Sequence, residues 1–232
     1  MYPDDNSKMK LFPLLLFLLT ASTYAADDIG SQFLAQAQAG DKRAQYLLAD
    51  TYYSAGNRES AHYWAEKAAQ NGDVDAIALL AQLTLKQDYP QARALAEQAS
   101  RAGSKAGDVV LARILVNSNA GKPDYPQALR LLDSAAQDVE SDAAVDAQML
   151  LGLIYANGGP VAEDDDKAAW YFKRSSALSR TGYAEYWAGM MFLQGESGFI
   201  ASNKQKALQW LNLSCMEGFD TGCEEFDRLS GN

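Results

Sequence analysis

Alanine-rich amphipathic segments recur along most of the chain. In five of them a small residue is followed three positions later by a large one, and a pair of small residues comes four and five positions after that. Residues at this spacing lie on one face of an α-helix. Each segment is therefore predicted to be a helix that buries a face of small residues. The leading residues are Ala61, Ala92, Ala128, Ala168 and Ala207.

A second helical segment precedes each of these five. The predicted first helices cover residues 44–53, 76–85, 107–116, 147–155 and 184–192. One column holds Leu48, Leu80, Leu111, Leu151 and Ala188. A small residue follows each of them, which lets neighbouring helices approach closely. The leading alanines of the second helices are about 31 to 40 residues apart, in the range of helix-pair repeats. The pattern predicts an all-α array of about five helix pairs.

The fourth copy, which reads AQMLLGLIY at 147–155 and KAAW at 167–170, resembles the Sel1-like repeat (SLR) family, a relative of the tetratricopeptide repeat. The first copy, AQYLLADTY at 44–52, is nearly as similar. In copies two and three, Thr84 and Leu115 replace the tyrosine that ends this pattern. The resemblance implies an all-α, right-handed solenoid of about five helix-turn-helix repeats with capping helices.

The repeats are expected to fill residues 44–218. The two ends of a repeat array have no neighbour to cover them, so each end needs a cap. Residues 26–43 are predicted to contain an N-terminal capping helix with Phe33 and Leu34 turned inward, and residues 219–232 a C-terminal capping segment.

The N-terminus has the three-part layout of a secretory signal peptide. An apolar run at 11–19 follows two lysines, and small residues lead from it to Ala25. The run is far shorter than the roughly 20 residues that a membrane-spanning helix needs. We expect residues 1–25 to be removed and the mature protein to be periplasmic or secreted, with no integral membrane anchor. Both Met1 and Met9 remain open as the start.

The chain has two cysteines, Cys215 and Cys223. An even number in an exported chain favours a disulfide, and the alternative is a pair of unpaired thiols. The spacing also resembles that of cysteine-rich secreted members of the family. A bridge here would staple the last helix of the array. A redox-active role has less support because no Cys-x-x-Cys spacing is present.

Candidate chemistry is sparse. His62 is the only histidine, which excludes nearly every nucleophile–histidine pair and any multi-histidine metal site. The run Glu163-Asp164-Asp165-Asp166 matches no ion-binding loop. It stands before a predicted helix, where acidic side chains cap and solvate the N-terminus, and contact with a basic partner is the alternative. No catalytic residue, metal site or cofactor is therefore predicted.

The net charge of −10 opposes binding to nucleic acid or to an anionic membrane surface. The natural complement of such a chain is another protein with a basic surface.

Two columns of the first helices form a candidate binding stripe. Reading across the copies, these columns hold Leu47, Leu79, Val110, Leu150 and Trp187, and Asp50, Gln82, Arg113, Leu153 and Met190, with Tyr186 beside them. The stripe becomes more apolar toward its C-terminal end, and aromatic and methionine side chains are typical interface anchors. The alternative is that the stripe packs one first helix on the next.

The resemblance implies two functions for an exported solenoid without catalytic residues. One is an immunity or inhibitor protein that neutralises a toxic effector, for example an antibacterial lipase. The alternative is a structural adaptor that assembles a cell-envelope complex, such as a motor, secretion or polysaccharide machine. An enzyme is not expected, because the sequence offers no site for one.

Overall fold

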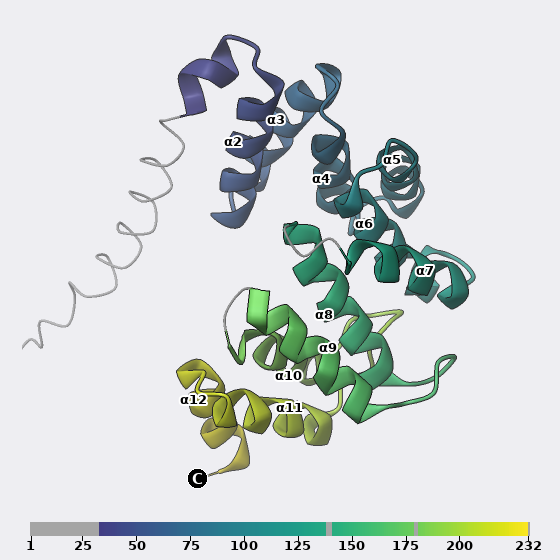
Figure 1. Cartoon of the computed structure of the whole chain (residues 1–232), viewed down its shortest axis with the longest axis vertical. Coiled ribbons are helices and arrows are strands. Elements are labelled where there is room, and N and C mark those ends of the chain that lie inside the picture. The colour runs from purple at the N-terminus through teal and green to yellow at the C-terminus, as the bar shows by residue number, and fades with distance from the viewer. Residues whose placement is uncertain (1–32, 138–140, 179–180, 232) are drawn as a thin grey trace, which may run out of the picture. The chain divides into compact units, whose positions relative to one another are not determined.

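The computed structural model describes residues 33–137, 141–178 and 181–231 (Figure 1). It divides into a first unit that ends at Ala76 and a second that begins at Ile77. The predicted signal peptide, residues 1–25, lies outside the described residues. Within them the structure contains helices and no strand, apart from an isolated bridge between Glu196 and Ile200.

The first unit packs a short helical segment, residues 33–38, with helices α2 (Lys42–Ser54) and α3 (Arg58–Gln70). Helix α2 packs on α3. The core consists of Ala37, Ala44 and Leu48, and the partly buried side chains around it are Phe33, Leu34, Tyr52 and Trp64. The inward orientation predicted for Phe33 and Leu34 is thus what the structure has.

Side-chain caps mark where several of the helices begin. The Ala44 backbone N–H donates to Asp41 Oδ1 (2.7 Å) at the start of α2. The Ala76 N–H donates to Asp73 Oδ1 (3.0 Å) at the start of α4 (Val74–Thr84), which begins in the first unit and ends in the second. Aspartate at such positions satisfies N–H groups that have no partner within the helix.

The second unit continues with helix pairs. Its further elements are α5 (Tyr89–Arg101), α6 (Lys105–Val116), the 3-10 turn η1 (Ser118–Ala120), α7 (Tyr125–Ala135), α8 (Asp142–Asn157), α9 (Asp165–Leu178), α10 (Tyr183–Gln194), α11 (Lys204–Met216) and α12 (Asp220–Ser230). From α5 on, consecutive helices pack on each other, and the first helices α6, α8 and α10 also touch in that order. This arrangement confirms the predicted all-α solenoid of helix pairs.

The small-residue face predicted for the second helices is their buried face. Ala61, Ala92, Ala128, Ala168 and Ala207 are all fully buried. Large side chains fill the space opposite small ones. A Cβ atom on Gly152 would come within 2.4 Å of the Phe172 ring, and one on Gly189 within 2.6 Å of the Leu211 side chain. Close approach of the helices therefore depends on small residues where the sequence pattern placed them.

The second helices of copies two and three each carry a proline near their start. Pro90 and Pro126 occupy the first turn of α5 and α7, which begin one residue earlier. A backbone N–H in that turn has no partner within the helix, so proline costs little there. Asp88 and Asp124 provide the caps.

Candidate functional site: the aromatic surface of helix α10

The structure divides the predicted binding stripe into a buried and an exposed part. Leu79, Val110, Leu150 and Leu153 are only 6–8% exposed, and the last three belong to the core of the second unit. For these residues, packing explains the apolar column. Leu47, Gln82, Arg113, Tyr186 and Met190 are partly exposed, and Asp50 and Trp187 are exposed. Use of the stripe as a groove stays a prediction, and except for Leu47 on α2 its accessible large apolar side chains lie on α10.

Arg113 is held by the loop between α10 and α11, residues 195–203. Its guanidinium forms an ion pair with Glu196 (2.9 Å). Along the same loop, the Ser118 N–H donates to the Gly198 carbonyl (2.8 Å) and the Asn157 side chain donates to the Phe199 carbonyl (3.1 Å). The loop therefore ties the C-terminal ends of α6 and α8 to α10.

Replacing Gly198 by alanine should loosen this loop. Gly198 has φ +81°, and a Cβ atom there would lie 2.3 Å from Asn117 Oδ1. We expect a loss of about 1–2 kcal/mol of stability from the left-handed backbone, and faster amide hydrogen exchange at Ser118 from the clash. Gly159 is the matched control, because it has φ +97° and open space around it. Equal exchange at Ser118 in Gly198→Ala and Gly159→Ala would show that the loop tolerates the clash.

Helix α10 has one buried face and one aromatic face. Ala184, Ala188, Gly189 and Phe192 are buried. Tyr183, Tyr186, Trp187 and Met190 follow a helical spacing on the other side and are at least partly exposed. We call these four side chains the α10 aromatic surface. Trp187 is its most accessible member, at 42% exposure.

Phe219, which precedes α12, packs against the buried side of the α10 aromatic surface. It is buried, and its ring centroid lies 5.3 Å from that of Tyr186 and 6.0 Å from that of Tyr183. Trp187 in turn packs edge-on against Tyr186 (5.7 Å) and Tyr183 (6.1 Å). Such pairs favour fixed relative orientations of the rings. The exposed tryptophan is thus presented on a packed aromatic base.

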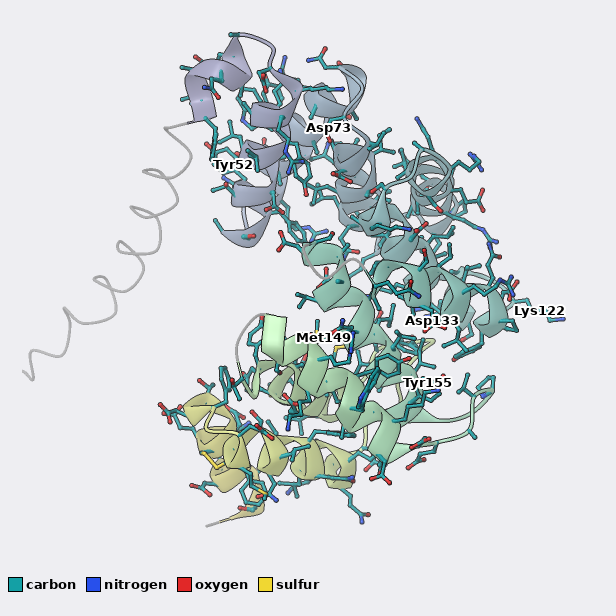
Figure 2. All side chains as sticks on the ribbon, viewed as in Figure 1. Tyr52, Asp73, Lys122, Asp133, Met149 and Tyr155 are labelled. Atoms are coloured by element: carbon teal, nitrogen blue, oxygen red, sulfur yellow. A yellow bond between two sulfur atoms is a disulfide. The ribbon has the colours of Figure 1, made fainter. Side chains whose placement is uncertain are left out.

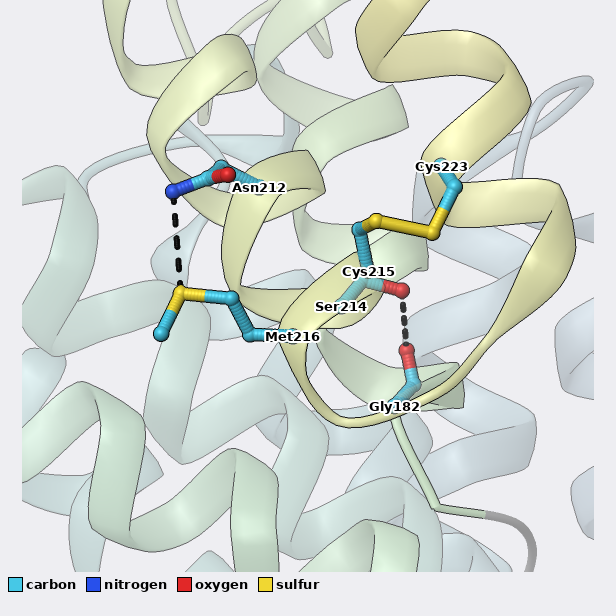
Figure 3. The surroundings of a disulfide bond; sticks show 6 residues. All are labelled: Gly182, Asn212, Ser214, Cys215, Met216 and Cys223. Atoms are coloured by element: carbon cyan, nitrogen blue, oxygen red, sulfur yellow. Dashed lines mark hydrogen bonds between the residues drawn. A yellow bond between two sulfur atoms is a disulfide. The ribbon is translucent and has the colours of Figure 1, made fainter.

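A disulfide closes the segment that carries Phe219. Cys215 near the end of α11 is bonded to Cys223 in α12, as predicted (Figure 3). Beside it, the Ser214 hydroxyl donates to the Gly182 carbonyl (2.7 Å) just before α10. A Cβ atom on Gly182 would lie 2.8 Å from Phe219 Cβ, so the backbones approach closely here. The bridge, the hydrogen bond and this contact together hold the turn after α11 against the start of α10.

Glu185 is an ionisable side chain buried beneath the same helix, at 2% exposure. Its Oε2 accepts a hydrogen bond from the Ser176 hydroxyl (2.8 Å) of α9. Burial raises the pKa of the Glu185 carboxyl above its ordinary value of 4.5, and the nearby Glu217 adds to this effect. Hydrogen bonds from the backbone and from Ser176, and the charge of Lys173, act in the opposite direction without cancelling it. Burial is the largest of these effects, and the net change in the pKa of Glu185 is upward.

A pH dependence of stability follows from the raised pKa of Glu185. The folded state binds the Glu185 proton more tightly than the unfolded chain does. The stability that this proton contributes is therefore complete below pH 4.5 and is lost as the pH rises through the pKa of Glu185 in the folded state. In Glu185→Gln, urea unfolding followed across this window should show a smaller loss with rising pH than in the wild type. An unchanged slope in Glu185→Gln would contradict the assignment.

A second exposed tryptophan lies on α9. Trp170 is 53% exposed, and the Arg174 guanidinium lies over its ring at 4.7 Å from the centroid. The ring of its neighbour Tyr171 stacks on that of Tyr155, and the Tyr171 hydroxyl donates to Asp133 (3.5 Å); Tyr155 and Asp133 are labelled in Figure 2. Burial together with the charge of Asp133 raises the pKa of Tyr171 to about 12. A partner that covered this face of the Trp170 indole would have to displace the Arg174 guanidinium. Trp170, which is more exposed than Trp187, therefore serves as a control for it.

The acidic run at 163–166 spans the start of α9, which begins at Asp165, and three of its four side chains have partners. Asp164 Oδ1 accepts from the Lys167 N–H (2.9 Å) at the helix start, Glu163 pairs with Lys206 (2.9 Å), and Asp165 accepts from Gln209 (3.0 Å). These contacts favour capping over a contact with a partner. In the described part of the chain no cluster of three or more His, Cys, Asp or Glu side chains forms a metal site, and no helix is long and apolar enough to cross a membrane.

Sequence reasoning missed Tyr183 and Phe219 as parts of the surface. Tyr183 lies four residues before Trp187, and Phe219 lies inside the segment that the two cysteines bracket. Both signals were present, but the stripe was read from repeat columns, and neither residue belongs to one. His62 is exposed and its Nδ1 lies 3.7 Å from a Glu66 carboxylate oxygen one turn along α3, so the structure adds no functional role for it.

Comparison with known proteins identifies the repeat. The family model described as Sel1 repeat matches residues 42–73, 75–104, 111–138, 145–179 and 182–219. The Sel1-repeat-containing protein YjcO of Escherichia coli (strain K12) is 64% identical over 225 residues, which cover 95% of this chain and 98% of that protein.

Solved structures agree with this match. The crystal structure of a Sel1 repeat protein from Klebsiella pneumoniae subsp. pneumoniae has a TM-score of 0.83 and 68% identity, covering 87% of this chain and 99% of that one. A Sel1 repeat protein from Oxalobacter formigenes, with a TM-score of 0.51 and 23% identity over 85% of this chain and 57% of its own, shares the fold.

Proposed function

Because this chain belongs to the Sel1 repeat family and is a protein-binding solenoid, we propose that it is an exported, non-catalytic immunity protein that neutralises a toxic effector in the periplasm. The α10 aromatic surface contacts the effector. To neutralise the effector in this way, the solenoid only has to cover the effector's active-site or target-binding surface. The solenoid itself therefore needs no catalytic group.

The single observation that carries the proposal is the exposed Trp187 on its packed base of Tyr183, Tyr186 and Phe219. Tryptophan and tyrosine dominate the binding energy of protein interfaces, usually near the centre of the contact. A rigid aromatic base lowers the entropy lost on binding. The net charge of −10 supports a partner with a basic surface.

Export is the second part of the proposal. The N-terminal segment resembles a signal peptide that ends at Ala25. N-terminal sequencing of the protein from a periplasmic fraction should therefore begin at Ala26. A chain recovered from the cytoplasm with residues 1–25 still attached would remove this part of the proposal while leaving the binding surface untested by that result.

In-cell photo-crosslinking identifies the partner. p-Benzoylphenylalanine at position 187 should capture one specific protein, and the same group at position 170 should not. The captured protein, sent to the periplasm alone, should stop growth, and co-expression with the wild-type chain should restore it. Trp187→Ala should fail to restore growth, whereas Trp170→Ala should succeed.

The scaffold function is the other outcome of this experiment. It would be indicated if position 187 captured several envelope components, none of them toxic, and if deletion of the protein disturbed their assembly. A captured toxin that kills equally with and without the chain would contradict the immunity role.

A further inference from the structure

We propose that the α10 aromatic surface, together with the acidic side chains that border it, binds a cationic segment of the partner in which lysine or arginine alternates with large apolar residues. This inference rests on the proposed protein-binding function and specifies the chemistry of what is bound. Cationic side chains would meet the acidic border while apolar side chains cover Trp187.

The acidic border comes from the turn after α11 and from α12. Asp220, Glu224 and Asp227 follow the spacing i, i+4, i+7 and so share one face of α12, and all three are exposed, as is Glu217 in the turn. Within the described residues none of these four forms an ion pair, whereas the neighbouring Glu225 pairs with Arg228. The face thus carries a row of like charges that repel each other at helical spacing.

The border adjoins the aromatic surface directly. Asp220 follows Phe219, whose ring packs against Tyr186 and Tyr183. A Cβ atom on Gly182, the residue before α10, would lie 3.5 Å from Glu217 Cβ. The Glu217 charge also reaches the buried Glu185, whose pKa it helps to raise. Glu217 and Asp220 therefore lie beside the aromatic surface at the start of α10, and Glu224 and Asp227 continue the acidic row along α12.

The same contacts make this surface rigid. Phe219 and Asp220 lie inside the segment closed by Cys215 and Cys223, and the Ser214 hydroxyl fastens that segment to the Gly182 carbonyl (Figure 3). A ligand that meets groups already in place loses less conformational entropy on binding. The disulfide is therefore expected to support affinity as well as stability.

A cationic and apolar segment fits this surface better than the alternatives. A purely basic segment would gain only exposed ion pairs, which are weak and screened by salt. A purely apolar segment would cover Trp187 but would place no positive charge beside the carboxylates, so their mutual repulsion would remain. An acidic one would be repelled both by the border and by the net charge of the chain.

Fluorescence anisotropy with short labelled peptides tests the proposal on the full chain with its disulfide formed. The probe is a peptide of about 12 residues built from Leu-Lys-Lys-Leu units, of the length that docks on one helix face. Its comparison peptides replace every lysine by glutamate or every leucine by glycine. The probe should bind at least about tenfold more tightly than either, and raising the salt about tenfold should weaken it severalfold.

Variants locate the binding. Trp187→Ala and the triple change Asp220→Asn, Glu224→Gln, Asp227→Asn should each weaken the probe about tenfold or more. Trp170→Ala is the control for the first. Glu59→Gln, Asp142→Asn and Asp166→Asn together are the control for the second, because they remove the same number of charges elsewhere. Both controls should bind within about twofold of the wild type.

Equal weakening by the two triple variants would show that overall charge, and not this surface, attracts the probe, and would overturn the proposal. Unchanged binding in Trp187→Ala would also overturn it. If position 187 still captures a specific cellular protein while the cationic probe binds no better than its glutamate twin, the protein-binding function stands and the cationic partner is wrong.

Discussion

Replacing Trp210 by alanine is expected to lower the free energy of unfolding by about 3–5 kcal/mol. Trp210 is 1% exposed in the core of the second unit and packs edge-on against Phe172, with 4.9 Å between ring centroids. Phe172 in turn fills the space above Gly152. Alanine at 210 would remove most of a buried indole and leave a cavity that neighbouring helices close only in part.

Urea denaturation followed by circular dichroism measures this loss. Trp170→Ala is the matched control, since it removes the same side chain from an exposed site on α9. It should cost less than about 1 kcal/mol, most of it from the lost contact with Arg174. A loss at Trp210 no larger than at Trp170 would show that the α9–α11 packing is not part of the stable core.

Removing the disulfide is expected to cost about 2.5 kcal/mol, from the entropy of a closed segment of this length. The variant carries both Cys215→Ser and Cys223→Ser, and the two bonded cysteines are eight residues apart in the sequence. The same segment holds Phe219 against α10, so amide exchange should accelerate in α12 before the other helices of the second unit.

The wild-type protein under reducing conditions provides the control for the serine changes themselves. It should lose the same stability as the double variant, and reduction should leave the double variant unchanged. Full stability in the reduced wild type would show that packing around Phe219 holds α12 without the bridge.

The fold could be predicted because each position of the repeat has a similar packing environment in every copy, which restricts the size of its side chain. The alanines at one repeat position, such as Ala61, Ala128 and Ala207, are fully buried, and the packed helices leave no space for a larger side chain. The same small residue therefore recurs in every copy. The partner small residues, such as Gly152 opposite Phe172, complete the helix pairs. Local spacing therefore determined which helices exist and which faces they bury.

The site was only partly predictable, because its accessibility depends on neighbours far away in sequence. Leu150 and Leu153 occupy the same columns as Trp187 and Met190, yet they are buried since α8 lies between α6 and α10. The contact of Arg113 with Glu196 joins residues 83 positions apart, which no repeat pattern indicates. Among the stripe residues of α6, α8 and α10, the large apolar side chains that stay accessible are Tyr186, Trp187 and Met190, all on α10.

The function class follows from the family, whereas the surface follows from the structure. Five repeats between residues 42 and 219 make this chain a protein-binding solenoid. Which of its faces binds depends on where large apolar side chains stay accessible. We propose the face that carries Trp187 on its aromatic base, and the acidic border adds the charge expected to select the partner.

The most direct test of the α10 aromatic surface is isothermal titration calorimetry of the captured partner with three forms of the chain. The wild type and Trp170→Ala should bind with the same affinity, within about twofold, whereas Trp187→Ala should bind at least about 30-fold more weakly, the loss of a central tryptophan anchor. Unfolding curves establish that all three forms are folded. Equal affinity of Trp187→Ala and the wild type would contradict the account.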